Sequence, residues 1–192
     1  MKTLVLHGSP RRGGNSDTLA KSLEDGMREG GASQFWHFYA NELDIGHCQG
    51  CMTCQDSDDN SCAIQDDMQE IYSAFIEADT VVFATPMFWG YMTSQLKTIL
   101  DRMEALAVGP EEWWRGKTFV AVITYWYHYE STVKFFERIC PTFGVEFHPV
   151  IYCSHEEGQE GDVHVSQRPE KLEEAYGLGL RLAKANSKSA EL

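Results

Sequence analysis

The stretch Leu4-Val5-Leu6-His7-Gly8-Ser9-Pro10-Arg11-Arg12-Gly13-Gly14-Asn15-Ser16 lies near the start of this chain of 192 residues and runs from apolar residues into a loop rich in glycine and polar residues. Its apolar start predicts a short buried strand that ends at Gly8 and Pro10. A helix is predicted to begin near Ser16 and to stop at Gly30 and Gly31. A strand that passes through a glycine-rich loop into a helix is a common way to bind a phosphate group.

The loop itself carries groups that suit an anion. Gly13 and Gly14 allow the backbone to curl inward, and the first turn of the helix directs unpaired N–H groups and its positive dipole end at the loop. The sequence is neither a Walker loop nor a G-x-G-x-x-G fingerprint. An ordinary turn in which Ser16 caps the helix explains the loop alone equally well. The side chains expected to contact a phosphate are those of Ser9, Arg11, Asn15, Ser16 and Thr18.

Apolar strands alternate with helical periodicity along the rest of the chain. Strands are predicted at residues 4–6, 35–39, 80–84, 119–123 and 145–152, and helices at 16–29, 68–76, 96–106, 133–140 and 172–182. Five such units predict an α/β fold of three layers with a doubly wound parallel five-stranded sheet, for which we take the common strand order 2-1-3-4-5. We expect one domain at residues 1–185, with a cysteine-rich insertion at 46–66 and a loose tail at 186–192.

A second unusual loop, Thr85-Pro86-Met87-Phe88-Trp89-Gly90-Tyr91, follows the third predicted strand. In this strand order the crevice between strands 1 and 3 is where ligands bind, so both loops are predicted to border it. The aromatic residues suit stacking on a flat ligand, although burial in the core is the commoner use of such residues.

Composition limits the classes of partner. The formal net charge of −13, from 16 basic and 29 acidic residues, argues against nucleic acid and against anionic membranes. No apolar run is long enough for a transmembrane helix, so we expect a cytoplasmic protein. An anionic ligand must therefore be held by local donors.

Four of the six cysteines, Cys48, Cys51, Cys54 and Cys62, form a C-x2-C-x2-C-x7-C run. In a reducing compartment such a cluster favours metal or redox chemistry over disulfides. The overlapping spacings match the ferredoxin type of grip on a 4Fe–4S cluster, which ranks first. Free thiols rank second and a zinc site third. Cys140 and Cys153 are predicted to be inert core residues.

These motifs together make the chain resemble the NADPH-dependent FMN reductase family of flavodoxin-like proteins. The resemblance rests on Gly8-Ser9-Pro10-Arg11 with Asn15-Ser16, on residues 85–90 and on residues 96–102. The cysteine run with Ile64-Gln65-Asp66-Asp67-Met68 resembles the iron–sulfur flavoprotein branch. Gly161-Asp162-Val163 resembles the last segment of the family. The aromatic run Thr124-Tyr125-Trp126-Tyr127-His128-Tyr129 departs from the glycine-rich stretch usual there, which leaves the electron donor open.

The resemblance implies specific cofactor contacts. The loop residues named above would hold the phosphate of FMN, and the ribityl chain and ring would lie against Pro86, Met87, Phe88, Trp89 and Gly90. The four clustered cysteines would hold the iron–sulfur cluster. FMN would carry the chemistry, so no catalytic side chain is predicted. The resemblance also implies a homodimer or homotetramer.

The predicted function is that of an FMN-dependent oxidoreductase that takes electrons from NAD(P)H or another donor and passes them to a small-molecule or protein acceptor. Two alternatives stay open. One is a non-catalytic electron carrier of the flavodoxin type, which the acidic composition favours. The other is a flavin-only NAD(P)H:FMN or quinone reductase in which the cysteine site is empty. A module without flavin ranks last.

Overall fold

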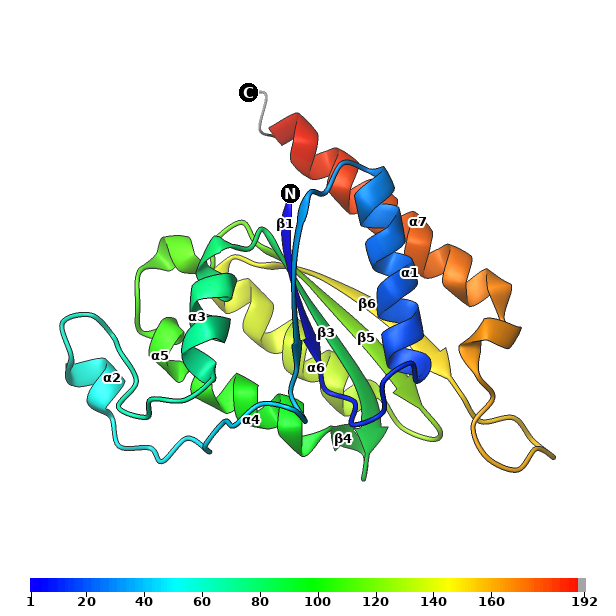
Figure 1. Ribbon diagram of the computed structural model, residues 1–192, viewed down its shortest axis with the longest axis horizontal. Helices are drawn as coiled ribbons and strands as arrows, with labels where there is room; N and C mark the ends of the chain where they lie inside the picture. The colour runs from blue at the N-terminus through cyan, green and yellow to red at the C-terminus, as the bar shows by residue number, and fades with distance from the viewer. Residues whose placement is uncertain (190–192) are drawn as a thin grey trace.

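Five parallel strands form the centre of the fold (Figure 1). The structure is a computed structural model that describes residues 1–189. They are β1 (Lys2–His7), β2 (Gln34–Tyr39), β3 (Thr80–Phe88), β5 (Thr118–Tyr125) and β6 (Glu146–Cys153). Their order is β2-β1-β3-β5-β6, so the predicted flavodoxin-like order is confirmed. A short sixth strand, β4 (Tyr91–Met92), pairs antiparallel with the end of β3. It was not predicted because two residues show no periodicity.

The alternation of side chains along the strands produces two apolar layers. On β1, Leu4 and Leu6 belong to one core and Val5 to the other. The core that contains Val5 lies under α1 (Asn15–Glu29) and α7 (Pro169–Ser189). The core that contains Leu4 and Leu6 lies under four helices, α3 (Met68–Glu77), α4 (Ser94–Arg102), α5 (Glu104–Ala107) and α6 (Glu130–Ile139). Figure 1 shows these two groups of helices on opposite faces of the sheet. A parallel sheet needs this cover because both of its faces are apolar.

Two glycines allow α1 and α7 to pack closely. A Cβ atom at Gly26 would lie 2.0 Å from the carbonyl oxygen of Tyr176, and one at Gly179 would lie 2.0 Å from that of Leu23. No other residue type fits at either position without moving a helix. The contact between these helices holds the start of α1, and therefore the loop before it, against the sheet.

Two of the predicted helices were wrong in their extent. The helix predicted at 96–106 is divided at Met103, because the carbonyl of Arg102 accepts a hydrogen bond from the Tyr72 hydroxyl at 2.8 Å instead of continuing the helix. The helix predicted to include Cys140 ends at Ile139, one residue before a short 3₁₀ turn (Cys140–Phe143) that contains Pro141.

The C-terminal tail predicted to be loose from residue 186 is helical as far as Ser189. Residues 190–192 of that prediction lie outside the described residues. Other short elements are α2 (Thr53–Asp56) and 3₁₀ turns at Glu111–Trp113 and Val165–Gln167. Among the residues that the structure describes, no helix is both long and apolar enough to cross a membrane.

Candidate functional site

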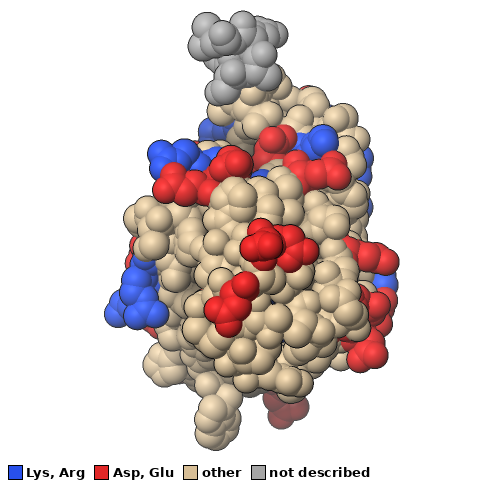
Figure 2. Space-filling view, turned by 90° about the vertical axis from the view of Figure 1, so that its left-hand side faces the viewer, with Lys and Arg blue, Asp and Glu red and all other residues tan. Residues whose placement is uncertain are grey.

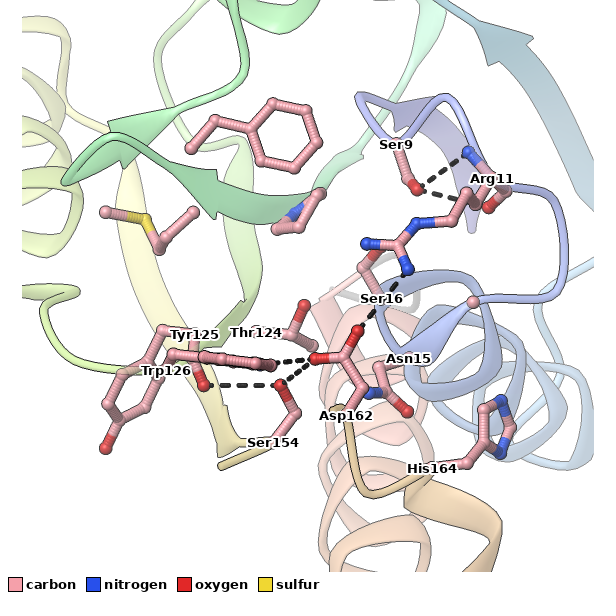
Figure 3. A pocket seen from close by; sticks show the side chains of 14 residues that line it. Ser9, Arg11, Asn15, Ser16, Thr124, Tyr125, Trp126, Ser154, Asp162 and His164 are labelled. Carbon is pink, nitrogen blue, oxygen red and sulfur yellow. Dashed lines mark hydrogen bonds and ion pairs between the residues drawn. The ribbon is translucent and has the colours of Figure 1, made fainter. Parts of the chain in front are cut away.

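A cavity of about 360 Å³ opens at the carboxyl ends of the central strands. Its volume falls in the range of roughly 300–1,000 Å³ that is typical of small-molecule sites. Figure 3 shows side chains from the loop after β1, the end of β3, the end of β5 and the segment after β6 around it. The lining consists of Ser9, Arg11, Gly14, Asn15, Ser16, Pro86, Met87, Phe88, Thr124, Tyr125, Trp126, Ser154, Asp162 and His164.

The loop after β1 is shaped by its own hydrogen bonds. The hydroxyl of Ser9 donates to the carbonyl of Arg11 and accepts from the Arg11 N–H, both at 3.1 Å. Gly13 has a φ of +68°, which favours glycine. The N-cap of α1 is Gly14, which supplies no side-chain cap. The first-turn N–H groups of α1 therefore point toward the cavity without a side chain in front of them.

Ser16 is placed as an anion-binding residue would be. It is only 2% exposed and it lines the cavity. Its hydroxyl is a hydrogen-bond donor of the kind that an anion in the cavity can accept from. Arg11 extends along the cavity wall, and one of its guanidinium nitrogens lies 3.4 Å from Asp162 (Figure 3).

The other two predicted loop residues have different surroundings. The side-chain amide of Asn15 lines the cavity but is already engaged, because it donates to Val163 at 3.2 Å and accepts from the Val165 N–H at 2.7 Å. Asn15 thus ties the segment after β6 to the loop. Thr18 does not line this cavity. Its hydroxyl donates to the carbonyl of Gly13 from behind the loop, and Thr18 borders a separate, smaller hollow there.

The loop after β3 contributes only part of its predicted set. Pro86, Met87 and Phe88 line the cavity, whereas Trp89 and Gly90 form the tip of the β3–β4 hairpin and are not among the lining residues. Trp89 and Gly90 both have positive φ values, of 50° and 79°. The Trp89 side chain is fully exposed, with a relative accessibility of 104%.

Several lining residues were not among the predicted contacts. Thr124, Tyr125 and Trp126 belong to the aromatic run that the sequence had marked as unusual. Asp162 accepts hydrogen bonds from the indole N–H of Trp126 at 2.5 Å and from the Ser154 hydroxyl at 2.8 Å. The sequence pointed to the motif around Asp162 only through the family resemblance. Asp162 lies far along the sequence from the two loops, so no local pattern predicts that it reaches the site.

Asp162 brings a negative charge to the cavity. Burial raises the pKa of its carboxyl, but hydrogen bonds from Trp126 and Ser154 together with Arg11 lower it overall, so it is ionised at neutral pH. The carboxylate therefore competes with any anionic ligand for Arg11. It also fixes the Trp126 ring at the mouth of the cavity.

The four clustered cysteines line a second cavity of about 40 Å³ near α2 and α5. All six cysteines are free, and Cys48 and Cys51 are exposed. Among the described residues, no three His, Cys, Asp or Glu side chains converge as they would around a single metal ion. A cubane cluster attaches each cysteine to a different iron and so does not require that convergence.

Arg102 fixes both ends of the insertion that contains this cavity. Its side chain is 1% exposed and pairs with Asp66, which is 9% exposed, at 2.7 Å. The same guanidinium donates to the carbonyls of Gly46 at 2.8 Å and Ile64 at 3.1 Å. Within the described residues its Nε has no partner, and Arg102 lines the cavity of the thiols. This leaves one buried donor free for a sulfur ligand.

The two remaining cysteines differ from each other. Cys140 is buried, as predicted, and burial raises the pKa of its thiol to about 12. Cys153 was predicted to lie in the core but is exposed. It is the last residue of β6, where the strand leaves the sheet and its periodicity no longer implies burial.

Comparison with known proteins places the chain. Residues 1–133 match the NADPH-dependent FMN reductase family. An iron–sulfur flavoprotein of Archaeoglobus fulgidus is 30% identical over 192 residues, which cover 96% of this chain and 80% of the relative. Another, from Methanosarcina thermophila, is 35% identical over 102 residues, which cover 53% of this chain and about half (52%) of that relative.

A solved structure, the NAD(P)H:quinone oxidoreductase from Methanothermobacter marburgensis, has a TM-score of 0.71 at 17% identity and covers 95% of this chain and 96% of its own. At that identity the likeness concerns the fold alone. The family match covers well over half of the chain and includes both loops of the larger cavity and the whole cysteine run. The chain belongs to the NADPH-dependent FMN reductase family of flavodoxin-like oxidoreductases.

Proposed function

We propose that this chain binds FMN in the larger cavity and moves electrons from a reduced nicotinamide or another donor, through a 4Fe–4S cluster held by Cys48, Cys51, Cys54 and Cys62, to an acceptor. The observation that carries the proposal is the convergence of Ser9, Arg11 and Ser16 with residues 86–88 in one cavity at the carboxyl end of the sheet. Family membership supports FMN as the cofactor.

The residues of the cavity fit FMN at both ends. At the polar end, the hydroxyl of Ser16, the first turn of α1 and Arg11 supply donors for a phosphate. At the other end, Met87 and Phe88 face Tyr125 and Trp126, which suit a flat aromatic ring. FMN supplies the ability to accept an electron pair and release electrons singly. The protein binds, orients and shields it.

The cysteine cavity fits a cluster by its chemistry. Four thiols line one small cavity, and soft sulfur ligands select iron–sulfur clusters, copper(I) or zinc. The guanidinium of Arg102 lies beside Cys62 and partly offsets the negative charge of thiolates.

Two alternatives have an observation in their favour. Figure 2 looks onto the end of the molecule where α2 and α5 lie, and acidic side chains stand across the middle of that face while basic ones lie toward its edges. Such a surface suits an electron carrier that docks on a basic protein. The exposed positions of Cys48 and Cys51 suit a flavin-only reductase.

The visible spectrum and the iron and sulfide content of anaerobically purified protein test both cofactors at once. Ser16→Glu is expected to lower FMN affinity at least about a hundredfold, because it replaces a donor to the phosphate by a like charge. Ser73→Glu on the exposed face of α3 is the matched control and leaves affinity unchanged. Equal affinity of the Ser16 variant and the wild type would overturn the phosphate assignment.

The cluster has its own pair of variants. Cys51→Ala is expected to remove iron and sulfide while FMN stays bound, and Cys140→Ala is expected to keep both. Iron content that survives Cys51→Ala would move the cluster elsewhere. Steady-state oxidation of NADPH and NADH with an artificial acceptor then distinguishes enzyme from carrier, because a carrier turns over neither.

We also propose that the chain self-associates at the mouth of the cavity. Phe88, Trp89, Trp126 and Tyr127 are exposed there, and exposed aromatic groups of this kind are common at interfaces. Light scattering of the wild type is expected to give a dimer or tetramer. A monomer at all accessible concentrations would contradict this.

A further inference from the structure

A buried histidine–aspartate pair lies directly behind the loop after β1. His7 is the last residue of β1, and Asp17 lies in the first turn of α1. Their side chains are 5% and 8% exposed, and His7 Nδ1 lies 3.0 Å from Asp17 Oδ1. The other oxygen of Asp17 accepts the N–H of Gly13 at 3.0 Å. Asp17 therefore fixes the curl of the loop whose other side lines the large cavity.

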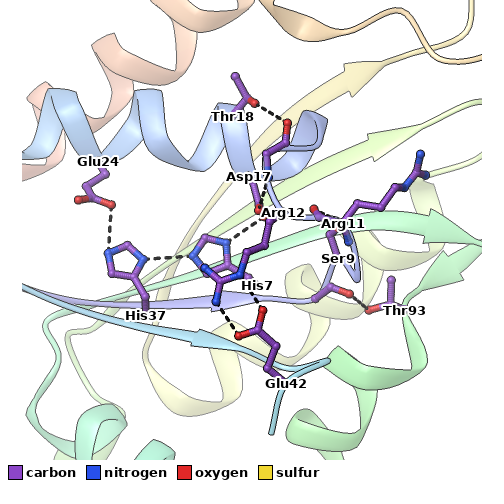
Figure 4. Close-up of polar contacts among 12 residues, drawn as sticks. His7, Ser9, Arg11, Arg12, Asp17, Thr18, Glu24, His37, Glu42 and Thr93 are labelled. Atoms are coloured by element: carbon purple, nitrogen blue, oxygen red, sulfur yellow. Dashed lines mark hydrogen bonds and ion pairs between the residues drawn. The ribbon is translucent and has the colours of Figure 1, made fainter.

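The pair continues into a longer chain of polar side chains, which Figure 4 shows running from the loop toward the edge strand. His7 Nε2 lies 3.1 Å from Nδ1 of His37 on β2. His37 Nε2 lies 3.3 Å from Oε2 of Glu24 on α1. The chain thus has a carboxylate at each end and two imidazoles between them.

Counting protons shows that this hydrogen-bonded row of four side chains is one proton short when both histidines are neutral. The three contacts need three ring N–H protons, on His7 toward Asp17, between the two rings, and on His37 toward Glu24. Two neutral imidazoles carry only two. One nitrogen lone pair must then face a carboxylate, which is unfavourable. A single added proton satisfies all three contacts and gives an imidazolium between two carboxylates.

Other charged and polar groups around these four side chains influence whether a histidine in the row is protonated. From α1, Lys21 and Arg28 oppose a positive charge on His37, and Arg28 pairs with Glu24. From β2, the Tyr39 ring stacks on His7 with centroids 4.1 Å apart. Arg12 and Glu42, which form an exposed ion pair, lie beside that tyrosine. Burial lowers the pKa of His37 against the opposing effect of Glu24. His37 itself therefore does not hold the third proton near neutral pH.

We propose that the Asp17–His7–His37–Glu24 chain positions the phosphate-binding loop and takes up one proton when a phosphorylated ligand binds. The proposal rests on the proposed function, because the ligand is FMN. A phosphate dianion on one side of the loop faces the Asp17 carboxylate on the other, and a proton on the two histidines offsets that repulsion. The four residues act as positioning residues and need not touch the ligand.

The size of the coupling follows from the separation of the charges. A unit charge and a dianion roughly 10 Å apart, at a partly wet boundary with an effective dielectric constant of about 50, change each other's equilibrium about ninefold. Because linkage is reciprocal, protonation strengthens FMN binding by the same factor by which FMN strengthens protonation. Riboflavin, which lacks the phosphate, should show no such coupling.

Calorimetry and fluorescence titration of the wild type against His37→Gln test the proposal. Both proteins are titrated with FMN and with riboflavin between about pH 5.5 and 8.5, in two buffers of different ionisation enthalpy. The wild type is expected to take up more protons with FMN than the variant does, and to gain about ninefold in affinity relative to it on acidification. The titration of the FMN phosphate itself cancels in this comparison.

Further variants make the result decisive. Glu24→Gln is expected to move the proton uptake to lower pH, and His148→Gln, which replaces a histidine paired with Glu146 on β6, is expected to behave as wild type. Identical pH profiles for wild type and His37→Gln with tight FMN binding would overturn this inference alone. Failure of every protein to bind FMN at any pH would overturn the proposed function and this inference with it.

Discussion

Replacement of Arg102 by methionine is the perturbation whose outcome the structure specifies most closely. Methionine keeps the bulk of the side chain but removes a guanidinium that donates to Asp66 at 2.7 and 3.2 Å and to the carbonyls of Gly46 and Ile64. Asp66 is then left as a nearly buried carboxylate without its cation. The two ends of the insertion at 46–66 also lose their common attachment.

The magnitude follows from what remains around Asp66. Removal of one partner of a buried ion pair costs about 3–5 kcal/mol. Asp66 keeps hydrogen bonds from the N–H groups of Gly46 at 2.8 Å and Met68 at 3.1 Å, so the lower end applies. We expect a loss of about 3 kcal/mol in the free energy of unfolding, equivalent to a fall of roughly 6–12 °C in Tm for a chain of this size.

Urea unfolding followed by tryptophan fluorescence measures this loss, with amide hydrogen exchange as the local readout for residues 46–66. Lys97→Met on the same helix is the control, because its pair with Asp101 is exposed and is worth less than about 0.5 kcal/mol. In a double-mutant cycle with Asp66→Asn, we expect a coupling energy of about 2 kcal/mol. A loss below about 1 kcal/mol for Arg102→Met, or strictly additive effects in the cycle, would refute the reasoning.

The same pair predicts a pH dependence. Burial raises the pKa of Asp66, but hydrogen bonds from Arg102 and from two backbone N–H groups lower it overall. A carboxyl whose folded pKa lies below its unfolded value of about 3.9 stabilises the fold fully above the unfolded pKa. This contribution is lost as the pH falls from the unfolded pKa through the folded pKa. The 46–66 segment should therefore lose hydrogen-exchange protection below about pH 4, and at higher pH in Arg102→Met.

The remaining predictions concern helix packing and thiol chemistry. Gly179→Ala is expected to destabilise the chain by at least about 1–3 kcal/mol in thermal unfolding, because its Cβ would lie 2.0 Å from a backbone oxygen of α1. Gly177→Ala on the same helix meets only a flexible arginine and should instead stabilise it by up to about 1 kcal/mol. In metal-free protein, Cys51 should be alkylated first, because hydrogen bonds involving Thr53 lower the pKa of its thiol. Cys140, with a pKa of about 12, should stay unmodified on the same timescale, as peptide mass mapping would show.

The sequence predicted the sheet well because its central strands are buried on both sides. Residues 80–84 and 119–123 are near-continuous apolar runs. Such runs are typical of central parallel strands, which are buried on both faces of the sheet. The alternation of strands and helices predicted a doubly wound sheet, and the flavodoxin-like resemblance selected its strand order. Local patterns failed where a single tertiary contact decides the boundary, as at Arg102, whose carbonyl is taken by Tyr72.

The candidate site was predictable only for the segments adjacent to strand ends. Ser9, Ser16 and Phe88 line the cavity because they lie just after a strand, in the first turn of a helix and at the end of a strand. Asp162 and the role of Asn15 as a tie to Val163 could not be inferred, because they depend on where a long segment after the last strand folds back. No periodicity spans that distance in the sequence.

One helix connects the two cavities. Thr93, the N-cap of α4, donates its hydroxyl proton to the carbonyl of Gly8 at 2.8 Å, and Gly8 has no side chain because a Cβ there would lie 2.8 Å from Leu96. Arg102, the last residue of α4, holds the cysteine insertion. Nine residues of helix span roughly 13–14 Å, so the phosphate-binding loop and the cysteine insertion are kept at a fixed separation by a single rigid element. Because both ends of α4 are anchored in buried contacts, neither cavity can shift relative to the sheet without strain on the contacts that shape the other.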